Sequence, residues 1–379
     1  MKIYAVGGSV RDELLGLPVQ DRDYVVVGAT PEEMVKLGYK PVGSDFPVFL
    51  HPETREEYAL ARTERKTARG YHGFEFHAAP DVTLEQDLER RDLTINARAK
   101  DEQGRILDPF NGTRDLEAGV LRHVSPAFAE DPVRILRVAR FAARFEFTIA
   151  PETLALMRAM AENGEADALV PERVWQELVR GLMETHPSRM FEVLHESGAL
   201  PRILPELARL FLDAGQAAHA MRLLDLAAER GTKLEVRLAA LARAFDPLAV
   251  EALAQRLKLP SACRDLALLA ARHANLIADA EALGAAELLE VLDSTDAWRR
   301  PERFADLMEA ALIGEDHAAA ARARLETALD AAAAVNAGEI AKQAKTPAEI
   351  RSRIHQARLD AIRDAIARHE FPTRHEGAK

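Results

Sequence analysis

The feature that most constrains the fold of this chain is a change in residue composition and hydrophobic periodicity near residue 130. Before that point, short β-branched runs alternate with glycines, prolines and helix-capping signals. After it, alanine, leucine, arginine and glutamate recur at helical spacing and strand signals are absent. The first part predicts strands over residues 2–6, 24–27, 47–50 and 58–60. The sequence therefore predicts an α+β domain to about residue 123, followed by an all-α region.

Length and composition indicate a globular protein of several domains. The chain has 379 residues, of which 48% are hydrophobic and 29% are charged. No apolar run reaches the roughly 20 residues of a membrane span, and no signal-peptide pattern stands at the N-terminus. The single cysteine, Cys263, excludes an internal disulfide framework and a cysteine-based zinc site. We therefore expect a cytoplasmic protein without a membrane partner.

The formal net charge of −11 argues weakly against nucleic-acid binding, because phosphate binding is driven by lysine and arginine. The net charge is a sum over the whole protein and does not reveal a local basic groove. It therefore does not exclude nucleic-acid binding.

The sharpest local feature is Asp21-Arg22-Asp23, directly before the strand expected at residues 24–27. Side chains alternate along a strand, so Asp21 and Asp23 should project to the same face. Two carboxylates that close repel each other unless a cation lies between them, and oxygen ligands suit a hard cation such as magnesium. Taken alone, an Asp-x-Asp pattern is more often a solvated turn.

A strand, a glycine turn and a helix precede these aspartates, at Gly7-Gly8-Ser9-Val10-Arg11-Asp12. Glycines let backbone amides approach a phosphate, a helix N-terminus favours negative charge, and Arg11 can bind phosphate oxygens through two hydrogen bonds. A lone Gly-Gly turn indicates little. Standing about a dozen residues before paired aspartates, it predicts a pocket that holds a triphosphate beside its metals.

A helix expected from Pro132 onward carries a run of arginines. At about 100° per residue, four of them fall within an arc of about 120°, and apolar residues take the complementary side. The arginines are Arg134, Arg137, Arg140 and Arg144. The pattern fits either an amphipathic helix with a basic solvent face or an arginine stripe that faces a polyanion.

Two further clusters lie between the aspartates and this helix. The segment 90–97 combines adjacent arginines with Asn96, whose amide suits a ribose hydroxyl or a backbone group. The segment 108–112 predicts a turn that Asp108 and Asn111 cap and brace.

Together these motifs resemble those of the bacterial CCA-adding enzymes, the class II tRNA nucleotidyltransferases related to bacterial poly(A) polymerases. The resemblance is close over about the first 200 residues and looser beyond them. Each motif alone is weak, whereas six in the family's order and spacing are specific. They are the segments 7–12, 21–23, 91–97, 108–112, 130–134 and 172–175.

The resemblance implies four domains and a set of site residues. The domains are a polymerase-β-like head at 1–123, a helical neck with the nucleotide-selecting helix at 124–205, a helical body at 206–300 and a helical tail at 301–379. Asp21 and Asp23 would be the catalytic residues that hold two magnesium ions, with Glu57 as a further candidate ligand. Positions that bind the nucleotide in relatives match Gly8, Arg11, Arg91, Arg137 and Arg140.

Asp131 and Arg134 match the pair that selects the base, and the chemistry agrees. Cytosine and adenine both present an amino donor beside a ring-nitrogen acceptor, which a carboxylate and a guanidinium can pair. Uracil and guanine present the opposite polarity and would leave polar groups unpaired, at about 1–3 kcal/mol each. The implied activity is template-independent addition and repair of the tRNA 3′ CCA from CTP and ATP. The implied partners are these nucleotides and the acceptor arm and 3′ end of tRNA, and no DNA.

Two segments bear on the variety of enzyme. The segment 62–70 resembles the family's flexible loop for switching from CTP to ATP, which favours full CCA addition. Many relatives carry an HD-type phosphohydrolase domain after the neck, but Arg243-Ala244 stands here where a His-Asp pair is expected. We therefore predict a degenerate or lost HD domain, without metal-dependent phosphatase or phosphodiesterase activity.

Three alternatives stay open. The first is a poly(A) polymerase or a CC-only or A-only enzyme of the same superfamily. The loop at 62–74 argues against this alternative. The second is a catalytically silent RNA-binding protein, which would be free to lose Asp21 and Asp23. The third is a small-molecule nucleotidyltransferase, which would not need the long helical part that suits recognition of tRNA by shape.

Overall fold

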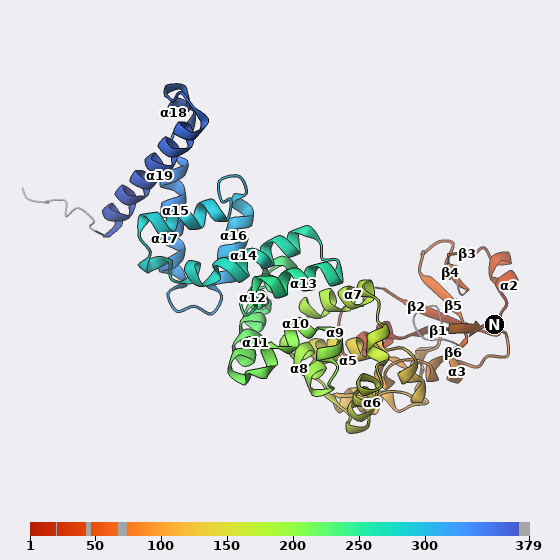
Figure 1. Ribbon diagram of the computed structural model, residues 1–379. Helices are drawn as coiled ribbons and strands as arrows, with labels where there is room; N and C mark the ends of the chain where they lie inside the picture. The colour runs from red at the N-terminus through yellow and green to blue at the C-terminus, as the bar shows by residue number, and fades with distance from the viewer. Residues whose placement is uncertain (20, 43–46, 67–73, 371–379) are drawn as a thin grey trace, which may run out of the picture. The chain divides into compact units, whose positions relative to one another are not determined.

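The computed structural model describes residues 1–19, 21–42, 47–66 and 74–370. It divides into two compact units, Met1–Ala208 and Arg209–Lys379 (Figure 1). All described strands belong to the first unit, and the described part of the second contains helices only. The expected order of an α+β head and an all-α remainder is confirmed. The division at residue 208 lies close to the expected end of the neck at 205, and the boundaries at 123 and 300 stay predictions.

A seven-stranded sheet in the order β3-β4-β5-β2-β1-β8-β9 forms the centre of the head. Val6 of β1 pairs with Asp23 of β2 in antiparallel register, and Glu57 of β5 pairs with Asp23 in parallel register. A separate antiparallel pair consists of β6 and β7. The bounds are β1 (Lys2–Val6), β2 (Asp23–Val27), β3 (Lys40–Pro41), β4 (Val48–Leu50), β5 (Glu57–Leu60), β6 (Thr63–Lys66), β7 (Phe74–His77), β8 (Ala99–Lys100) and β9 (Ile106–Leu107).

Helices flank the sheet and continue beyond it in the first unit. Those before the arginine-rich helix are α1 (Gly8–Leu14), α2 (Pro31–Lys36), α3 (Leu84–Glu89), the 3₁₀ helix η1 (Thr94–Asn96), α4 (Gly112–Glu117) and the 3₁₀ helix η2 (Pro126–Glu130). The remainder are α5 (Val133–Phe145), α6 (Pro151–Glu162), the 3₁₀ helix η3 (Glu165–Ala168), α7 (Pro171–Leu182), α8 (Ser188–Glu196), α9 (Leu200–Ile203) and α10 (Pro205–Ala208).

Alternation along β2 buries side chains on opposite faces of the sheet. Val25 belongs to a buried cluster with Leu88 of α3, whereas Val26 belongs to a second cluster with Met34 of α2. Both faces of the sheet are therefore covered at β2. Asp23, the first residue of the strand, is exposed.

The expectation that strands end before residue 130 is wrong. β11 (Thr148–Ile149) follows α5 and pairs in parallel with β10 (Val120–Leu121). A strand of two residues leaves no periodic signal, because alternation becomes readable only over about four residues or more.

The turn before α4 fixes that helix against η1. A Cβ at Gly112 would lie 2.0 Å from the carbonyl oxygen of Thr94, so only glycine fits there. Asp108 braces the turn as expected, because its carboxylate accepts from two successive backbone N–H groups at 2.7 and 2.8 Å. Asn111 contributes differently: it adopts the left-handed conformation at φ 57°, and its side chain makes no capping hydrogen bond.

α5 is anchored by its apolar side. Ile135, Val138 and Ala142 are fully buried, as the periodicity predicts, and the helix packs against α7 and α8. α7 and α8 approach closely at Gly181, where a Cβ would lie 2.1 Å from Met190 Sδ. The position of the arginine side of α5 is thereby fixed.

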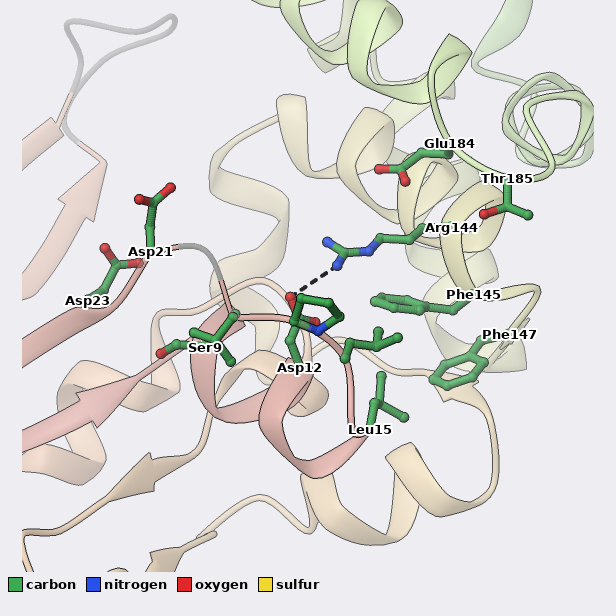
Figure 2. Close-up of a pocket in the computed structure, with 14 residues that line it drawn as sticks. Ser9, Asp12, Leu15, Asp21, Asp23, Arg144, Phe145, Phe147, Glu184 and Thr185 are labelled. Atoms are coloured by element: carbon green, nitrogen blue, oxygen red, sulfur yellow. Dashed lines mark hydrogen bonds and ion pairs between the residues drawn. The ribbon is translucent and has the colours of Figure 1, made fainter. Parts of the chain in front are cut away.

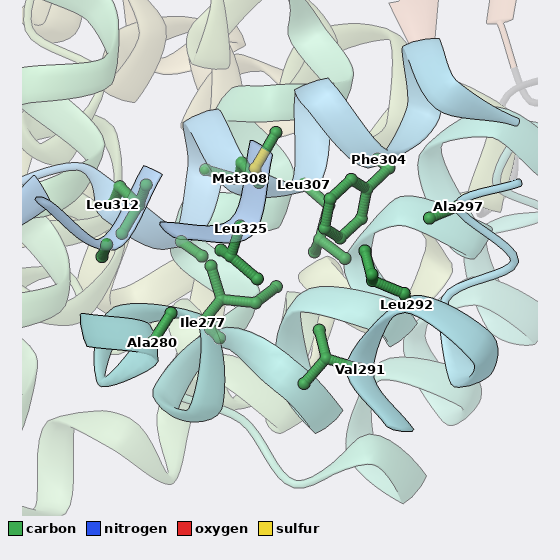
Figure 3. Packing of buried hydrophobic residues seen from close by; sticks show 14 of the residues in the cluster. Ile277, Ala280, Val291, Leu292, Ala297, Phe304, Leu307, Met308, Leu312 and Leu325 are labelled. Atoms are coloured by element: carbon green, nitrogen blue, oxygen red, sulfur yellow. The ribbon is translucent and has the colours of Figure 1, made fainter. Parts of the chain in front are cut away.

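The second unit has one extensive core. Buried side chains from α14, α15, α16 and α17 meet in a cluster that joins residues on both sides of position 300, and Figure 3 shows Ile277, Leu292, Phe304, Leu307 and Leu325 among them. None of the helices in the described ranges is long and apolar enough to cross a membrane. The helices are η4 (Leu210–Leu212), α11 (Ala214–Glu229), α12 (Leu234–Ala242), α13 (Pro247–Leu257), α14 (Ser261–Ala278), η5 (Ala280–Ala282), α15 (Ala285–Ser294), α16 (Pro301–Leu312), α17 (Ala318–Ala333), α18 (Ala337–Gln343) and α19 (Pro347–Glu370).

Arg243, which stands where a His-Asp pair is expected, has a largely buried side chain. Its side chain is 8% exposed and pairs with Glu315. The guanidinium also donates to the carbonyl oxygens of Ala310 and Ile313, at the end of α16, at 3.3 and 2.8 Å. A cation at this place stabilises the C-terminal carbonyls of a helix. Arg243 therefore fastens the end of α12 to the end of α16.

Candidate active site

The turn between β1 and α1 places backbone amides beside the start of β2. Because Val6 pairs with Asp23, Gly7 and Gly8 follow directly alongside that aspartate. Gly7 has φ 73°, and a Cβ there would lie 3.0 Å from Arg91 Nη1. The positive φ disfavours a side chain at Gly7, and both Gly7 and Gly8 line the pocket beside the aspartates.

Asp21 and Asp23 are both exposed, and their carboxyl groups project to the same side of the chain (Figure 2). Asp21 lies just before β2 and Asp23 is its first residue. Partial burial of the Asp23 carboxyl raises its pKa, the positive charge of Arg91 opposes this, and the negative charge of Asp21 adds to the rise. Two adjacent carboxylates with like charges repel each other, and their oxygen atoms are suitable ligands for a divalent cation.

Glu57 lies on the strand next to Asp23 and is exposed. It lines neither of the two pockets beside the aspartates. Among the residues that the structure describes, no three carboxylate, histidine or cysteine side chains form a group that could hold a metal ion. The role of Glu57 as a metal ligand stays a prediction.

A pocket of about 650 Å³ opens beside the aspartates and is lined mainly by arginines. We call it the arginine pocket; its basic residues are Arg11, Arg90, Arg91, Arg134, Arg137, Arg140, Arg144, Arg173 and Arg180. It brings together every nucleotide-binding residue expected from the sequence, namely Gly8, Arg11, Arg91, Asp131, Arg134, Arg137 and Arg140, with Asp21 and Asp23 at its edge. Such an excess of cations favours a polyanion such as a triphosphate.

Carboxylates from distant segments hold the arginines of α5. The pairs are Arg137 with Asp92 at 2.7 Å, Arg140 with Glu177 at 2.7 Å, and Arg144 with Asp12 at 3.0 Å. Arg140 is only 7% exposed. The arginine stripe is therefore not simply a solvent face, and its expected role in binding a polyanion stays a prediction.

Asp92 is the central acidic residue of this network. Burial would raise its pKa, but the charge of Arg137, hydrogen bonds from Asn96 and Arg137, and the charge of Arg134 hold the pKa well below its usual range. Asn96 donates to Asp92 at 3.0 Å and accepts from Arg11 at 2.7 Å. The amide of Asn96 thus connects Asp92 with Arg11 within the protein.

Arg11 is buried behind the glycine turn. Its Nε donates to Asp12 at 2.8 Å, and its guanidinium carbon lies 5.0 Å from the ring centroids of both Phe141 and Phe145. A guanidinium held by a carboxylate, an amide and two aromatic faces has little freedom to turn. Arg11 therefore lines the arginine pocket in a fixed orientation.

The two base-selecting candidates are also held in place. Arg173 makes two hydrogen bonds to the carboxylate of Asp131, at 3.1 and 2.8 Å. Arg134 donates to the carbonyl oxygens of Ala127 and Arg90 at 3.0 and 2.6 Å. Both side chains line the arginine pocket with fixed orientations, as a pair that reads a base edge requires.

A second pocket, of about 770 Å³, adjoins the same aspartates (Figure 2). It shares Gly8, Asp21, Asp23 and Arg144 with the arginine pocket. Its remaining wall is largely apolar, with Leu15, Leu17, Pro18, Val19, Phe145 and Phe147. We call it the aromatic pocket.

Most of the loop at 62–74 lies outside the described residues, which omit 67–73. Arg62 is held on the head, because its N–H donates to Asp87 at 3.3 Å and its carbonyl accepts from Arg90 at 3.0 Å.

The sequence alone did not single out Asp12, Asp92, Arg173 and Glu177 as site residues. Asp12, Asp92 and Arg173 stand inside motifs that carry the family resemblance, and that membership was the available signal. Glu177 had no such signal, because its partner Arg140 lies 37 residues away in the chain.

Comparisons with known proteins agree with this geometry. The family described as the poly A polymerase head domain matches residues 3–122, and the family described as a probable RNA and SrmB-binding site of polymerase A matches residues 146–211. The head and its site thus define a nucleotidyltransferase of the poly(A) polymerase class. The chain is 55% identical to the multifunctional CCA protein of Paraburkholderia phytofirmans, over 97% of this chain and 100% of that protein. It is 53% identical to that of Azoarcus sp., over 98% and 99%.

The chain belongs to the family of the multifunctional CCA proteins, and the resemblance expected from the motifs is confirmed. Among solved structures, the Bacillus stearothermophilus CCA-adding enzyme in complex with CTP matches with a TM-score of 0.67 and 26% identity, over 97% of this chain and 89% of that one. The alignment with the Paraburkholderia protein spans 414 positions, more than the 379 residues of this chain. The relative therefore has residues that this chain lacks.

Proposed function

We propose that this chain adds and repairs the 3′-terminal CCA of tRNA, without a nucleic-acid template, from CTP and ATP and with release of pyrophosphate. The observation that carries this proposal is the position of Asp21 and Asp23 at the edge of the arginine pocket. That position puts two metal-binding carboxylates next to a site for a triphosphate, which nucleotidyl transfer requires.

Asp21 and Asp23 would hold magnesium, with Glu57 as a further candidate ligand. Their paired oxygen donors, both beside the arginine pocket, fit a cation that would relieve the repulsion between their charges. When bound, the metal supplies activation of the attacking hydroxyl and neutralisation of charge on the triphosphate.

The side chains of the arginine pocket would position the nucleotide. Arg11, Arg91, Arg137 and Arg140 would bind the triphosphate and sugar, and the amides of the glycine turn would approach the phosphates. Asp131 would accept from the amino group of cytosine or adenine while Arg134 donates to the ring nitrogen. Because acidic and carbonyl partners fix these groups beforehand, they need no reordering when the nucleotide binds.

The names of the relatives support the same choice. Proteins that are more than half identical are named multifunctional CCA proteins, and the Bacillus stearothermophilus enzyme was solved with CTP. We place the reaction in the cytoplasm, in keeping with a lone buried cysteine, Cys263.

The proposed activity is tested by measuring the length of the extended tRNA. Purified protein with magnesium and a tRNA that lacks CCA is given CTP alone, ATP alone or both. We expect two additions with CTP and a third only when both nucleotides are present. Growth that stops at CC with both nucleotides indicates a CC-only enzyme, and long tails from ATP alone indicate a poly(A) polymerase. Bound tRNA without any extension would overturn the proposed activity.

We also propose that the second unit has no phosphohydrolase activity, because Arg243 binds helix carbonyls at the place of a His-Asp pair. Hydrolysis of bis-p-nitrophenyl phosphate with magnesium, manganese or nickel would contradict this.

A further inference from the structure

The two pockets beside Asp21 and Asp23 differ in chemistry. The arginine pocket has nine arginines in its wall, whereas Arg144 is the one basic side chain among the residues that line the aromatic pocket. The aromatic pocket's volume of about 770 Å³ lies within the range of ligand sites. Because both pockets reach the same two aspartates, a ligand in each would meet at the metal-binding carboxylates.

In-line nucleotidyl transfer requires two ligands in this arrangement. The attacking hydroxyl and the leaving pyrophosphate lie on opposite sides of the reacting phosphorus. Since the arginine pocket suits the triphosphate, the attacking hydroxyl approaches from the other side of the aspartates. We infer that the aromatic pocket is the subsite for the 3′-terminal nucleotide of the acceptor RNA, whose base stacks on Phe147 beside Phe145. This inference rests on the proposed function.

The aromatic wall suits an acceptor that changes at each step. During CCA addition the terminal nucleotide of the acceptor is different before each transfer, so its site cannot depend on one base edge. Stacking meets this requirement, because every base has an aromatic face. Phe145 and Phe147 are partly buried, with ring centroids 5.3 Å apart.

Both rings are braced from behind. Phe147 lies against the backbone at Gly119, where a Cβ would be 3.4 Å from its ring. Phe145 is stacked with Phe141 at a centroid distance of 6.1 Å, and the guanidinium of Arg144 lies 4.9 Å from its centroid. The rings thus form a fixed platform, as a stacking surface requires.

Besides Asp21 and Asp23, the described residues of the aromatic pocket include two acidic side chains, Asp12 and Glu184, and arginines pair with both. Asp12 pairs with Arg11 and Arg144 at 2.7 and 3.0 Å, and Glu184 lies 3.4 Å from Arg140. Burial raises the pKa of the Glu184 carboxyl, and the charge of Arg140 opposes this rise. Arg144 lines both pockets and stands where it can contact the last phosphodiester of the acceptor.

The test compares Phe147→Leu, which keeps an apolar side chain but removes the ring, with Phe147→Tyr, which keeps the ring. For each, the KM for a tRNA that lacks CCA and the equilibrium Kd for CTP are measured. We expect Phe147→Leu to raise the KM for tRNA roughly tenfold, as loss of one stacking contact should. The Kd for CTP should stay at the wild-type value, and Phe147→Tyr should restore the KM. An unchanged KM for tRNA in Phe147→Leu, or an equal rise in the Kd for CTP, would overturn the subsite.

A second measurement uses the wild-type protein and does not depend on a variant that folds. A tRNA acceptor ending in 4-thiouridine is crosslinked by light, and the attached residues are mapped. Crosslinks within 15–19 or 145–147 support the subsite, and crosslinks confined to other segments overturn it. If the wild type extends no tRNA at all, the proposed function fails. If it adds CCA while these tests give contrary results, only the subsite fails.

Discussion

At the scale of single residues, the site depends on carboxylates that hold arginines. Asp92 is buried, ionised and bonded to Arg137 and Asn96, and Asn96 in turn bonds Arg11. One acidic side chain therefore orients two of the arginines that we propose bind the nucleotide. Removing its charge would take away the nearest acidic partner of Arg137 and leave Glu177, at 4.0 Å, as its remaining ion pair.

Asp92→Asn should lower the free energy of unfolding by about 3–5 kcal/mol at pH 7, the usual loss when one partner of a buried ion pair is removed. Because the folded pKa of Asp92 is lowered, its stabilisation is fully present above the unfolded value of about 3.9 and is lost as pH falls through the folded value. Urea unfolding at pH 7 and pH 3 should show a smaller difference from the wild type at pH 3. An equal difference at both values would contradict this. Asp81→Asn, at an exposed aspartate, is the control and should stay within about 0.5 kcal/mol.

Arg173 fixes the carboxylate that would select the base. In Arg173→Ala, Asp131 loses the two hydrogen bonds from Arg173 and keeps the one from the N–H of Val133. Its carboxylate is then held less firmly, so the ratio of kcat/KM for CTP over UTP should fall about tenfold, or about 1.4 kcal/mol. Arg173→Lys keeps the charge but not the two-pronged geometry and should fall between the wild type and Arg173→Ala. A wild-type ratio in Arg173→Ala would show that Arg173 has no part in selection.

The sequence predicted candidate site residues that the structure brings together, but not the carboxylates that hold the arginines among them. Local motifs contain Gly8, Arg11, Asp21 and Asp23, and their spacing alone predicted that these residues share a pocket. Asp92 and Arg137 are 45 residues apart, and no periodicity links them. The arginine arc likewise left a solvent face open as an alternative, because the acids opposite it come from other elements.

At the scale of elements, sequence signals predicted helix starts accurately where neighbouring side chains form hydrogen bonds with the backbone N–H groups. Thr30 accepts from the N–H of Glu33, and the Glu33 carboxylate accepts from the N–H of Thr30, which completes the capping box at the start of α2. The short strand at Thr148–Ile149 was missed because its partner at Val120–Leu121 is remote in sequence.

Gly112→Ala tests how closely α4 must approach η1. The new Cβ would overlap the carbonyl of Thr94, so the backbone must move and the free energy of unfolding should fall by at least about 1–3 kcal/mol. Because η1 carries Asn96, the affinity for CTP should fall as well. Equilibrium unfolding and CTP binding check both effects.

Gly338→Ala, in a helix with its nearest neighbouring atom at 3.4 Å, is the matched control. It should raise stability by up to about 1 kcal/mol and leave CTP binding unchanged. Wild-type behaviour of Gly112→Ala would contradict the close approach.

At the scale of the whole molecule, the second unit uses an arginine where relatives of the family were expected to carry a His-Asp pair. Arg243→Ala should leave two buried carbonyls unpaired, at about 1–3 kcal/mol each, and should lower the thermal stability of the protein. Differential scanning calorimetry measures this. Arg299→Ala removes an arginine whose side chain is 81% exposed and should have little effect. Equal effects of the two substitutions would contradict the role of Arg243.

The central claim is that Asp21 and Asp23 catalyse CCA addition, and Asp21→Asn tests it most directly. The substitution keeps the size of the side chain and removes the charge that would bind metal. With CTP, ATP, magnesium and a tRNA that lacks CCA, we predict full CCA addition by the wild type. The variant should bind the tRNA equally well but react at least about a thousandfold more slowly, or about 4 kcal/mol in activation free energy. Extension by Asp21→Asn at the wild-type rate would contradict the account.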